Sequence, residues 1–229
     1  MPKTLADFQQ QVDRLVQDTA QRLPAEARDS CIVEALTSRY SKARHLPKVK
    51  DLAGDGATYK WTLNTTNFPG WTQNFSVITG LEYPAGDREP KMLTGEDWLV
   101  YWPNSTAPEL RLRSVTPAAG KTLRVTYATI HAEDGSTVPD GDFYGVVNLA
   151  ASLCCRSLAA AYAQSGDTAI GADAVDYRGK SQQYAELAKV YEERFKEAFG
   201  LDEDEEQSAA SATAEWQDTL ADGGERITH

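Results

Sequence analysis

Two helical patterns in the second half of the chain constrain its fold more than any other feature. Apolar residues recur at steps of three and four over residues 142–162, and again over residues 180–199. The two stripes consist of Val146, Leu149, Ala150, Leu153, Cys154, Leu158, Ala161 and Tyr162, and of Tyr184, Leu187, Ala188, Tyr191, Phe195, Ala198 and Phe199. This spacing places each stripe on one face of an α-helix. The polar connector 164–179 contains three glycines, so we predict a helical hairpin whose second helix begins near Lys180.

Two further helices are predicted at the start of the chain. Thr4 is a suitable N-cap for a helix whose apolar positions begin at Leu5, and Leu23–Pro24 ends that segment. A second helix is expected from about Ala25 to Tyr40, with a buried stripe that consists of Cys31, Ile32, Ala35 and Leu36.

From Ser41 the helical period is lost and short alternating stretches take its place. We predict strands at Tyr59–Leu63, Ser76–Tyr83, Trp98–Trp102, Glu109–Arg113 and Lys121–Thr129. Turn signals such as Phe68–Pro69–Gly70 separate them, and four of the five tryptophans lie in this region.

The predicted fold class is therefore α+β: a bundle of two helical hairpins with an inserted antiparallel β module. The first hairpin covers residues 1–46, the β module 47–139 and the second hairpin 140–199, and residues 200–229 form an acidic, flexible tail.

The tail holds most of the excess negative charge. Residues 200–229 contain nine acidic residues and one basic residue, so they carry −8 of the chain's −11 and leave −3 for residues 1–199. The chain has no basic footprint of the kind that nucleic-acid binding requires. Within the tail, Trp216 and nearby Leu220 stand out, because tryptophan is enriched as an anchor at interfaces.

Other composition features exclude several classes of protein. No apolar run approaches the roughly 18 residues of a membrane span, and the N-terminus lacks a signal-peptide core, so we expect neither membrane insertion nor standard secretion. Cys31, Cys154 and Cys155 are an odd number inside helical patterns, which favours core thiols in a reducing compartment.

Candidate catalytic motifs are weak, so we predict that the protein is not an enzyme and needs no cofactor or metal. The stretch from Ala174 to Ser181 fits only a loose phosphate-loop pattern, without the preceding hydrophobic strand, and a helix start near Lys180–Ser181 explains it better. The acids Asp167, Asp173 and Asp176 lack calcium-loop spacing. The three histidines are scattered without partners at zinc-ligand spacing.

The second hairpin also carries a resemblance. Residues Asp142–Cys154 (DFYGVVNLAASLC) and Ile170–Tyr184 (IGADAVDYRGKSQQY) are similar to the corresponding helices of head–tail connector (adaptor) proteins of tailed bacteriophages. The segment Tyr40–Lys42, followed by Val49–Asp51 and Gly54–Gly56, resembles the start of the β insertion in many of them. The resemblance covers most of residues 30–199 and consists of helix-face and turn residues.

The resemblance implies a structural virion protein, made in the cytoplasm of the bacterial host and located in the neck between capsid and tail. Such proteins form a homo-oligomeric ring, usually of twelve copies, beneath the portal protein, and tail-completion or tail-terminator proteins dock on it. DNA passes through the channel without specific binding, which a surplus of acidic residues favours.

Two sets of site residues follow from this implied role. The small-residue helix suits close packing between subunits, for which we expect Val147, Ala151, Ser157 and Ala160 as contacts. The tail is expected to bind the portal through Leu201, Trp216 and Leu220. An alternative function is a ligand- or carbohydrate-binding β module on a helical scaffold, which the aromatic-rich β region suggests.

Overall fold

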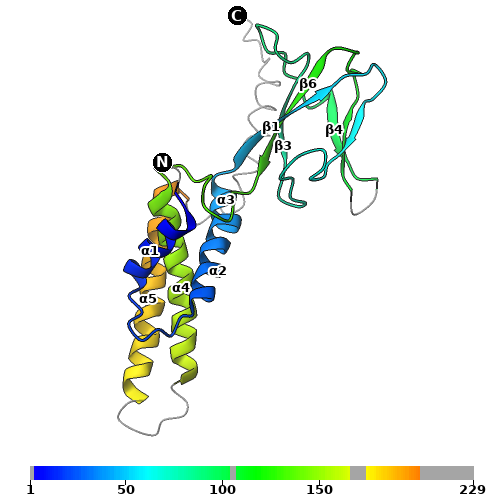
Figure 1. Ribbon diagram of the computed structural model, residues 1–229. Helices are drawn as coiled ribbons and strands as arrows, with labels where there is room; N and C mark the ends of the chain where they lie inside the picture. Colours follow the sequence, from blue (N-terminus) through cyan, green and yellow to red (C-terminus); the bar gives the residue numbers. More distant parts are fainter. Residues whose placement is uncertain (1–2, 104–106, 166–173, 202–229) are drawn as a thin grey trace, which may run out of the picture. The chain divides into compact units, whose positions relative to one another are not determined.

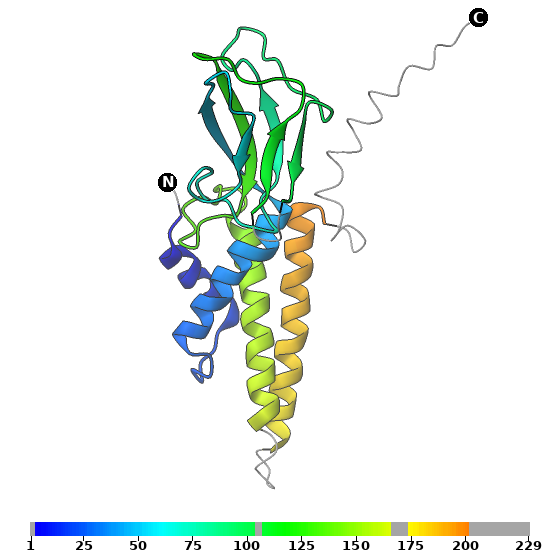
Figure 2. The same ribbon diagram turned by 90° about the vertical axis from the view of Figure 1, so that its right-hand side faces the viewer.

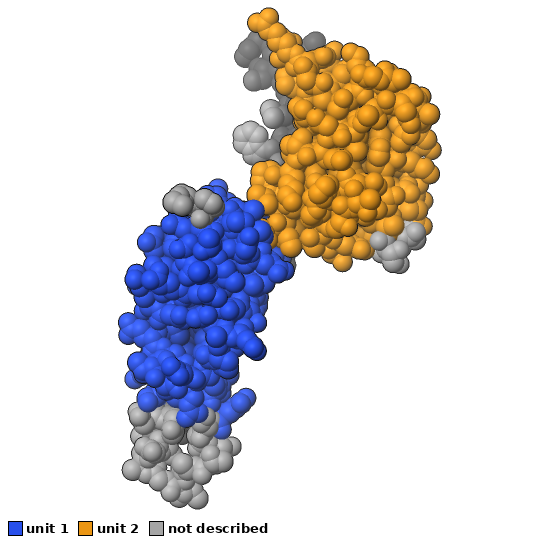
Figure 3. Space-filling model, in the orientation of Figure 1, with its two compact units in different colours: residues 1–44, 132–229 blue, residues 45–131 orange. Residues whose placement is uncertain are grey.

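The computed structural model describes residues 3–103, 107–165 and 174–201, and the chain divides into two compact units (Figure 3). Unit 1 comprises residues 1–44 and 132–229, and unit 2 comprises residues 45–131. The fold is mixed α+β, with helices in unit 1 and two small antiparallel sheets in unit 2. The helices are α1 (Leu5–Val16), α2 (Ala25–Glu34), the π-helical turn η1 (Ala35–Tyr40), α3 (Ser41–Ala43), α4 (Phe143–Ser165) and α5 (Ala174–Phe199).

The long helices α4 and α5 form the centre of unit 1, where they lie side by side in opposite directions (Figures 1 and 2). Hydroxyl groups of small residues link them: Ser152 donates to the carbonyl of Ala188 at 2.7 Å, and Ser181 donates to that of Ala159 at 2.8 Å. Both predicted helices are confirmed, but α5 begins at Ala174 rather than near Lys180. Lys180 and Ser181 are therefore inside the helix, and the prediction that they start it is wrong.

The N-terminal helices pack on α4 more than on each other. Thr4 is the N-cap of α1 as predicted, and it forms a capping box with Asp7, to which its N–H and its hydroxyl donate at 2.8 and 2.9 Å. The helix ends at Val16, well before Leu23, because Gln17 adopts a left-handed conformation with φ of 48°. The second predicted helix is confirmed as α2, which continues through η1 and α3.

One hydrophobic core serves all of unit 1. The stripe predicted on α4, except Ala161, lies in this core or against it. The stripe predicted on α2 and η1, Cys31, Ile32, Ala35 and Leu36, lies in it as well. Aromatic pairs fill the space between helices, with ring centroids 4.7 Å apart for Phe8 and Phe143 and 5.4 Å apart for Tyr40 and Phe199. By length and composition alone, residues Phe143–Gln164 could cross a membrane, contrary to the expectation from the sequence, but more than half of this helix is buried in the core.

Unit 2 is built from six short strands in two three-stranded antiparallel sheets. They are β1 (Leu46–Ala53), β2 (Lys60–Thr62), β3 (Ile78–Glu82), β4 (Trp98–Tyr101), β5 (Glu109–Leu112) and β6 (Thr122–Thr129). The strand orders are β1-β6-β3 and β2-β5-β4. All five predicted strands are confirmed, whereas β1 was not predicted as a strand.

The boundaries of the predicted insertion, 47–139, differ from those of unit 2 mainly at the C-terminal end. Residues 132–139 belong to unit 1, where Val138 joins the helical core and Gly135 lies against the ring of Phe8. The tail from residue 202, with Trp216 and Leu220, and most of the connector between α4 and α5 lie outside the described residues.

Candidate functional site

The four residues predicted as inter-subunit contacts on α4 fall into two groups. Val147 and Ala151 are buried in the core of unit 1, so their side chains are not presented to a neighbouring subunit, and this assignment is corrected. Ser157 and Ala160 are exposed, although the Oγ of Ser157 also lies 4.0 Å from the Sγ of Cys31 on α2. The error arose because small residues occur both on the buried face of α4 and on its exposed face.

Exposed apolar side chains mark a different part of unit 1. Leu187 is 38% exposed and Val190 is 41% exposed, and because they are three residues apart on α5 they share a face. Tyr144, at the start of α4, is 66% exposed. We refer to Leu187, Val190 and Tyr144 as the exposed apolar residues of unit 1. Leu187 and Ala198 belong to the apolar stripe predicted over residues 180–199, but the structure exposes both.

Leu201, the only predicted portal-binding residue within the described part of the chain, follows the end of α5. Gly200 adopts a left-handed conformation with φ of 63°, and the N–H of Leu201 donates to the carbonyl of Lys196 at 2.9 Å. The half-buried Leu201 side chain packs against the core of unit 1. Part of its apolar surface is therefore already used within the subunit.

In unit 2 the aromatic residues are divided between core and surface. Trp71 is buried with Phe68 and Tyr127, so it is not an outward-facing contact residue. Trp102 is 47% exposed, and Tyr101 beside it is exposed as well. The guanidinium of Arg111 lies 3.8 Å from the centre of the Tyr101 ring and also pairs with Glu109 at 2.9 Å. One face of Tyr101 is thus occupied by a cation–π contact.

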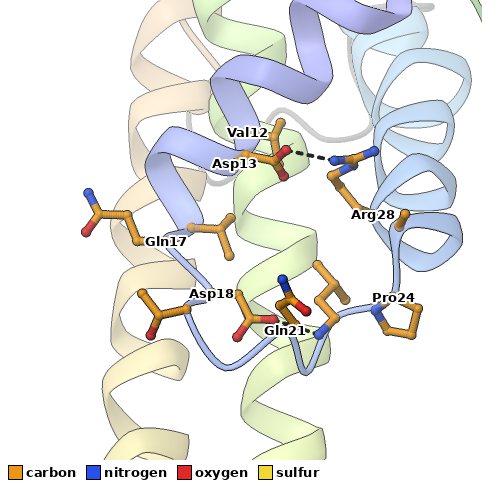
Figure 4. A pocket seen from close by; sticks show the side chains of 11 residues that line it. Val12, Asp13, Gln17, Asp18, Gln21, Pro24 and Arg28 are labelled. Atoms are coloured by element: carbon orange, nitrogen blue, oxygen red, sulfur yellow. Dashed lines mark hydrogen bonds and ion pairs between the residues drawn. The ribbon is translucent and has the colours of Figure 1, made fainter.

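A pocket of about 720 Å³ in unit 1 was not predicted from the sequence (Figure 4). It lies where α1 ends, between the turn 17–24 and the first turn of α2. The turn depends on Asp18, whose Oδ2 accepts the N–H of Leu23 at 2.7 Å, while the Oδ1 of Asp18 is buried without a hydrogen-bond partner. Arg28 borders the pocket and pairs with Asp13 at 2.7 Å and with Asp29 at 2.9 Å.

The charge of Arg28 is stabilised by its two acidic neighbours. Burial alone would disfavour the charged guanidinium, but the hydrogen bond to Asp29 and the charges of Asp13 and Asp29 outweigh it and raise the pKa of Arg28. Sequence reasoning missed this pocket because its signal was the eight-residue turn itself, which we took only as the end of a helix.

The described residues do not assemble a metal site. No group of three or more His, Cys, Asp or Glu side chains that could hold a metal lies together in the described ranges. Cys31, Cys154 and Cys155 are free and buried, and burial raises the pKa of Cys155 to about 11, which keeps that thiol protonated. The hydroxyl of Ser181, which belongs to the loose phosphate-loop pattern, donates a hydrogen bond to the carbonyl of Ala159. Asp167 and Asp173 lie outside the described residues.

A scan with protein-family models finds no match to this chain, and a search of curated proteins finds no similar sequence. The resemblance to head–tail connector proteins therefore stays a prediction.

Proposed function

We propose that this protein is a non-enzymatic structural subunit that forms a homo-oligomeric ring and joins the portal at the head of a tailed bacteriophage to the tail. The observation that carries the proposal is the exposed apolar surface on the two helices that bear the resemblance. Leu187, Val190 and Tyr144 face solvent although the core of unit 1 is already filled by other residues. Leu187 and Val190 share one exposed face of α5, and apolar side chains grouped in this way favour contact with another protein.

The finer architecture belongs to the same proposal. We regard α1–α2 and α4–α5 as two helical hairpins that form the wall of the ring, with the β unit as an inserted docking module and residues 202–229 as a flexible acidic arm. An arm that orders on its partner loses conformational entropy, and twelve copies bound to one portal ring offset that cost through high effective concentration. Its surplus of acidic residues repels DNA phosphates, which suits a channel through which DNA must slide.

The ring is tested by measuring the mass of the purified protein alone and with the portal ring of the same virus, by mass photometry. We expect a monomer alone and a fixed multiple, usually twelve copies, on the portal. The double variant Leu187→Glu/Val190→Glu should fail to form that complex, because it places charge on the exposed apolar face. Gln183→Glu, an exposed position of the same helix, is the control and should assemble normally. Normal assembly of the double variant would exclude this face as the ring contact.

The arm is tested by truncation after Leu201. Leu201 packs on the core, so removing residues 202–229 spares it and leaves the described helices of unit 1 intact. We expect the truncated protein to keep its helical circular dichroism but to lose portal binding, and the point variants Trp216→Ala and Leu220→Ala to weaken binding. Undiminished binding by the truncated protein would show that the arm is not the portal contact.

The exposed aromatics of unit 2 support one alternative function, a carbohydrate-binding module. Trp102, beside Tyr101, offers a ring face on which a sugar could stack. Binding of the full chain to a glycan array, abolished by Trp102→Ala, would favour this alternative over the connector.

A further inference from the structure

A group of basic side chains lies on unit 1 near the C-terminal end of α5. Glu192 on α5 accepts hydrogen bonds from two guanidinium groups: Arg39 of η1 donates to its Oε1 at 2.6 Å, and Arg156 of α4 donates to its Oε2. Lys42 follows one helical turn after Arg39. Lys196 follows one turn after Glu192 on α5. We call Arg39, Lys42, Arg156 and Lys196 the basic patch of unit 1.

The basic patch is open to solvent and carries surplus positive charge. The side chain of Arg156 is 52% exposed and that of Arg39 is 30% exposed, so a ligand can reach both guanidinium groups. The four cations of the patch exceed the single charge of Glu192 by three. Burial would raise the pKa of Glu192, but the hydrogen bond from Arg39 and the charges of Arg39, Arg156 and Lys196 lower it. The patch therefore favours an anionic partner.

The acidic residues of the surrounding helices offset this charge only in part. Residues 143–165 of α4 include no Asp or Glu, so Arg156 has no acidic neighbour on its own helix. On α5, Glu193 and Glu197 are turned by about 100° and about 140° around the helix axis from Glu192. Glu34 lies five residues before Arg39, which is more than one helical turn.

The chain itself supplies an anionic segment beside the patch. The described residues end at Leu201, whose N–H donates to the carbonyl of Lys196 at 2.9 Å, and five consecutive acids follow, Asp202–Glu206 (DEDEE). This end of α5 lies next to η1, because the ring of Phe199 is 5.4 Å from the ring of Tyr40. The acidic stretch 202–206 therefore starts where the helices that carry the basic patch meet.

The acidic stretch is also long enough to cover the patch. Glu192 precedes Leu201 by nine residues of the chain, or about 14 Å at the rise of an α-helix. Five extended residues span up to about 17 Å. The stretch can therefore return along α5 as far as Glu192 and the two guanidinium groups that contact it.

We propose that the acidic stretch 202–206 of each chain binds the basic patch of its own unit 1, with the guanidinium and ammonium groups donating to its carboxylates. Charge-assisted hydrogen bonds of this kind are stronger than neutral ones. The contact anchors the base of the C-terminal arm and leaves residues 207–229, with Trp216 and Leu220, available to a partner. The inference concerns the single chain, so it holds or fails independently of the ring and of portal binding.

Cross-linking of the purified full chain with a carbodiimide tests this contact, because the reagent joins a lysine to a carboxylate only where the two groups already touch. We expect a cross-link from Lys42 to the stretch 202–206, identified by mass spectrometry of peptides. Lys180 is the internal reference and should give none, since it lies about 24 Å from Lys196 along α5. A mixture of nitrogen-14 and nitrogen-15 protein distinguishes cross-links within one chain from those between chains.

Two arginine variants with the same change in charge test the patch. Arg156→Gln should lose the cross-link between Lys42 and the stretch, because it removes a central cation of the patch. Arg194→Gln is the matched control and should keep it, since Arg194 is an exposed arginine on another face of α5, with its guanidinium 5.7 Å from the ring centre of Tyr191. Both variants should keep the wild-type helical circular dichroism.

Two arm variants provide a second measurement that leaves the core of unit 1 unchanged. Each neutralises two aspartates and two glutamates. The test variant is Asp202→Asn/Glu203→Gln/Asp204→Asn/Glu205→Gln, and the control is Glu215→Gln/Asp218→Asn/Asp222→Asn/Glu225→Gln. In NMR spectra of the full chain, the Nε–H signal of Arg156 should shift in the test variant and stay in place in the control.

Each outcome decides the proposal. A cross-link from Lys42 within one chain that Arg156→Gln loses and Arg194→Gln keeps supports it, together with the shift of the Arg156 signal. Absence of the cross-link, cross-links only between chains, equal effects of the two arginine variants, or an unshifted Arg156 signal would overturn it. Displacement of the cross-link by duplex DNA at physiological salt would also overturn it and assign the patch to nucleic acid.

Discussion

The two units of this protein bury their hydrophobic cores in different ways. In unit 1 the large core residues come almost entirely from helices, so the core follows the 3.6-residue period of the sequence. In unit 2 the strands supply only part of the core, and Phe68 and Trp71 in the connection between β2 and β3 contribute two of its buried aromatic rings. The hydroxyl of Tyr127 on β6 donates to the carbonyl of Pro69 at 3.0 Å and holds that connection in place. A β core of this size depends on its loops, whereas the helical core does not.

Single substitutions in the two cores should have the largest effects on stability, each confined to its own unit. Phe195 in unit 1 and Phe68 in unit 2 are both fully buried, and replacing either with alanine should lower the free energy of unfolding of its own unit by about 3–5 kcal/mol. The chain provides separate probes in a Trp216→Phe background, because the helices of unit 1 dominate circular dichroism and the other four tryptophans, Trp61, Trp71, Trp98 and Trp102, lie in unit 2.

Denaturant unfolding followed by both probes checks this prediction. Phe195→Ala should shift the circular dichroism transition and leave the tryptophan fluorescence transition in place, while Phe68→Ala should do the reverse. If either variant shifts both transitions equally, the two cores unfold together and do not differ as independent units of stability.

The close approach of α4 and α5 gives the next largest effect. A Cβ atom added at Gly145 would lie 2.5 Å from Cε2 and 2.8 Å from Cζ of Phe199, so Gly145→Ala should cost about 1–3 kcal/mol despite the better helix propensity of alanine. Gly179 on α5 has no atom within 4 Å of an added Cβ, and Gly179→Ala should instead stabilise unit 1 by up to about 1 kcal/mol.

Thermal unfolding of both glycine variants, followed by circular dichroism, should therefore give shifts of opposite sign. A stabilised Gly145→Ala protein would mean that the Phe199 ring moves aside without loss, and that the glycine is not needed for helix contact.

Ion pairs should distinguish the units less strongly. Glu192 in unit 1 is only 16% exposed, accepts a hydrogen bond from Arg39 at 2.6 Å and pairs with Arg156. Removing its charge in Glu192→Gln should cost about 1–2 kcal/mol, since the hydrogen bonds from two guanidinium groups lose their charged acceptor. In unit 2 the Asp51–Arg124 pair, at 2.8 Å, is much more exposed, and Asp51→Asn should cost less than about 1 kcal/mol.

Salt provides the control for this pair of variants. The loss of stability caused by Asp51→Asn should disappear in high salt. The loss of stability caused by Glu192→Gln should persist, because the Glu192 carboxylate is partly shielded from water. Equal salt dependence of the two losses would show that burial does not set their difference.

The same contrast explains how much of the fold could be predicted from the sequence. The helices and five strands were predicted because their period is visible in side-chain polarity. Strand β1 was missed because its half-buried positions include Lys48 and Lys50 while Val49 is exposed, so polarity does not follow burial along it. Phe68 was interpreted only as part of a turn, since nothing in a turn signal shows that its aromatic ring enters a core.

The candidate sites could be predicted less well than the fold. Small residues on α4 indicated close packing but not whether the neighbour was α5 or another subunit, and Val147 and Ala151 face inward. The pocket beside Asp18 could not be foreseen, because it depends on Gln17 and Gln21 adopting left-handed conformations, with φ of 48° and 51°, that neither residue type favours.

The smallest predicted effect concerns two turn carboxylates at low pH. In unit 2 the hydroxyl and N–H of Thr58 and the N–H of Ala57 donate to Asp55 and lower its pKa to about 2, from the ordinary 3.8. In unit 1 the N–H and hydroxyl of Thr4 lower the pKa of Asp7 as well. Both pKa values are lower in the folded state, so the contribution of each carboxylate to stability is present above its unfolded pKa and is lost as the pH falls through its folded pKa. Asp55 accepts three such hydrogen bonds and Asp7 two, so a carboxyl NMR titration should find that Asp55 titrates at the lower pH.

The stability that the Asp55 carboxylate contributes should be lost as the pH falls from about 4 to about 2. Asp55→Asn should flatten the pH dependence of unfolding there, as followed by tryptophan fluorescence, and an unchanged pH profile would show that the turn at Asp55 does not stabilise unit 2.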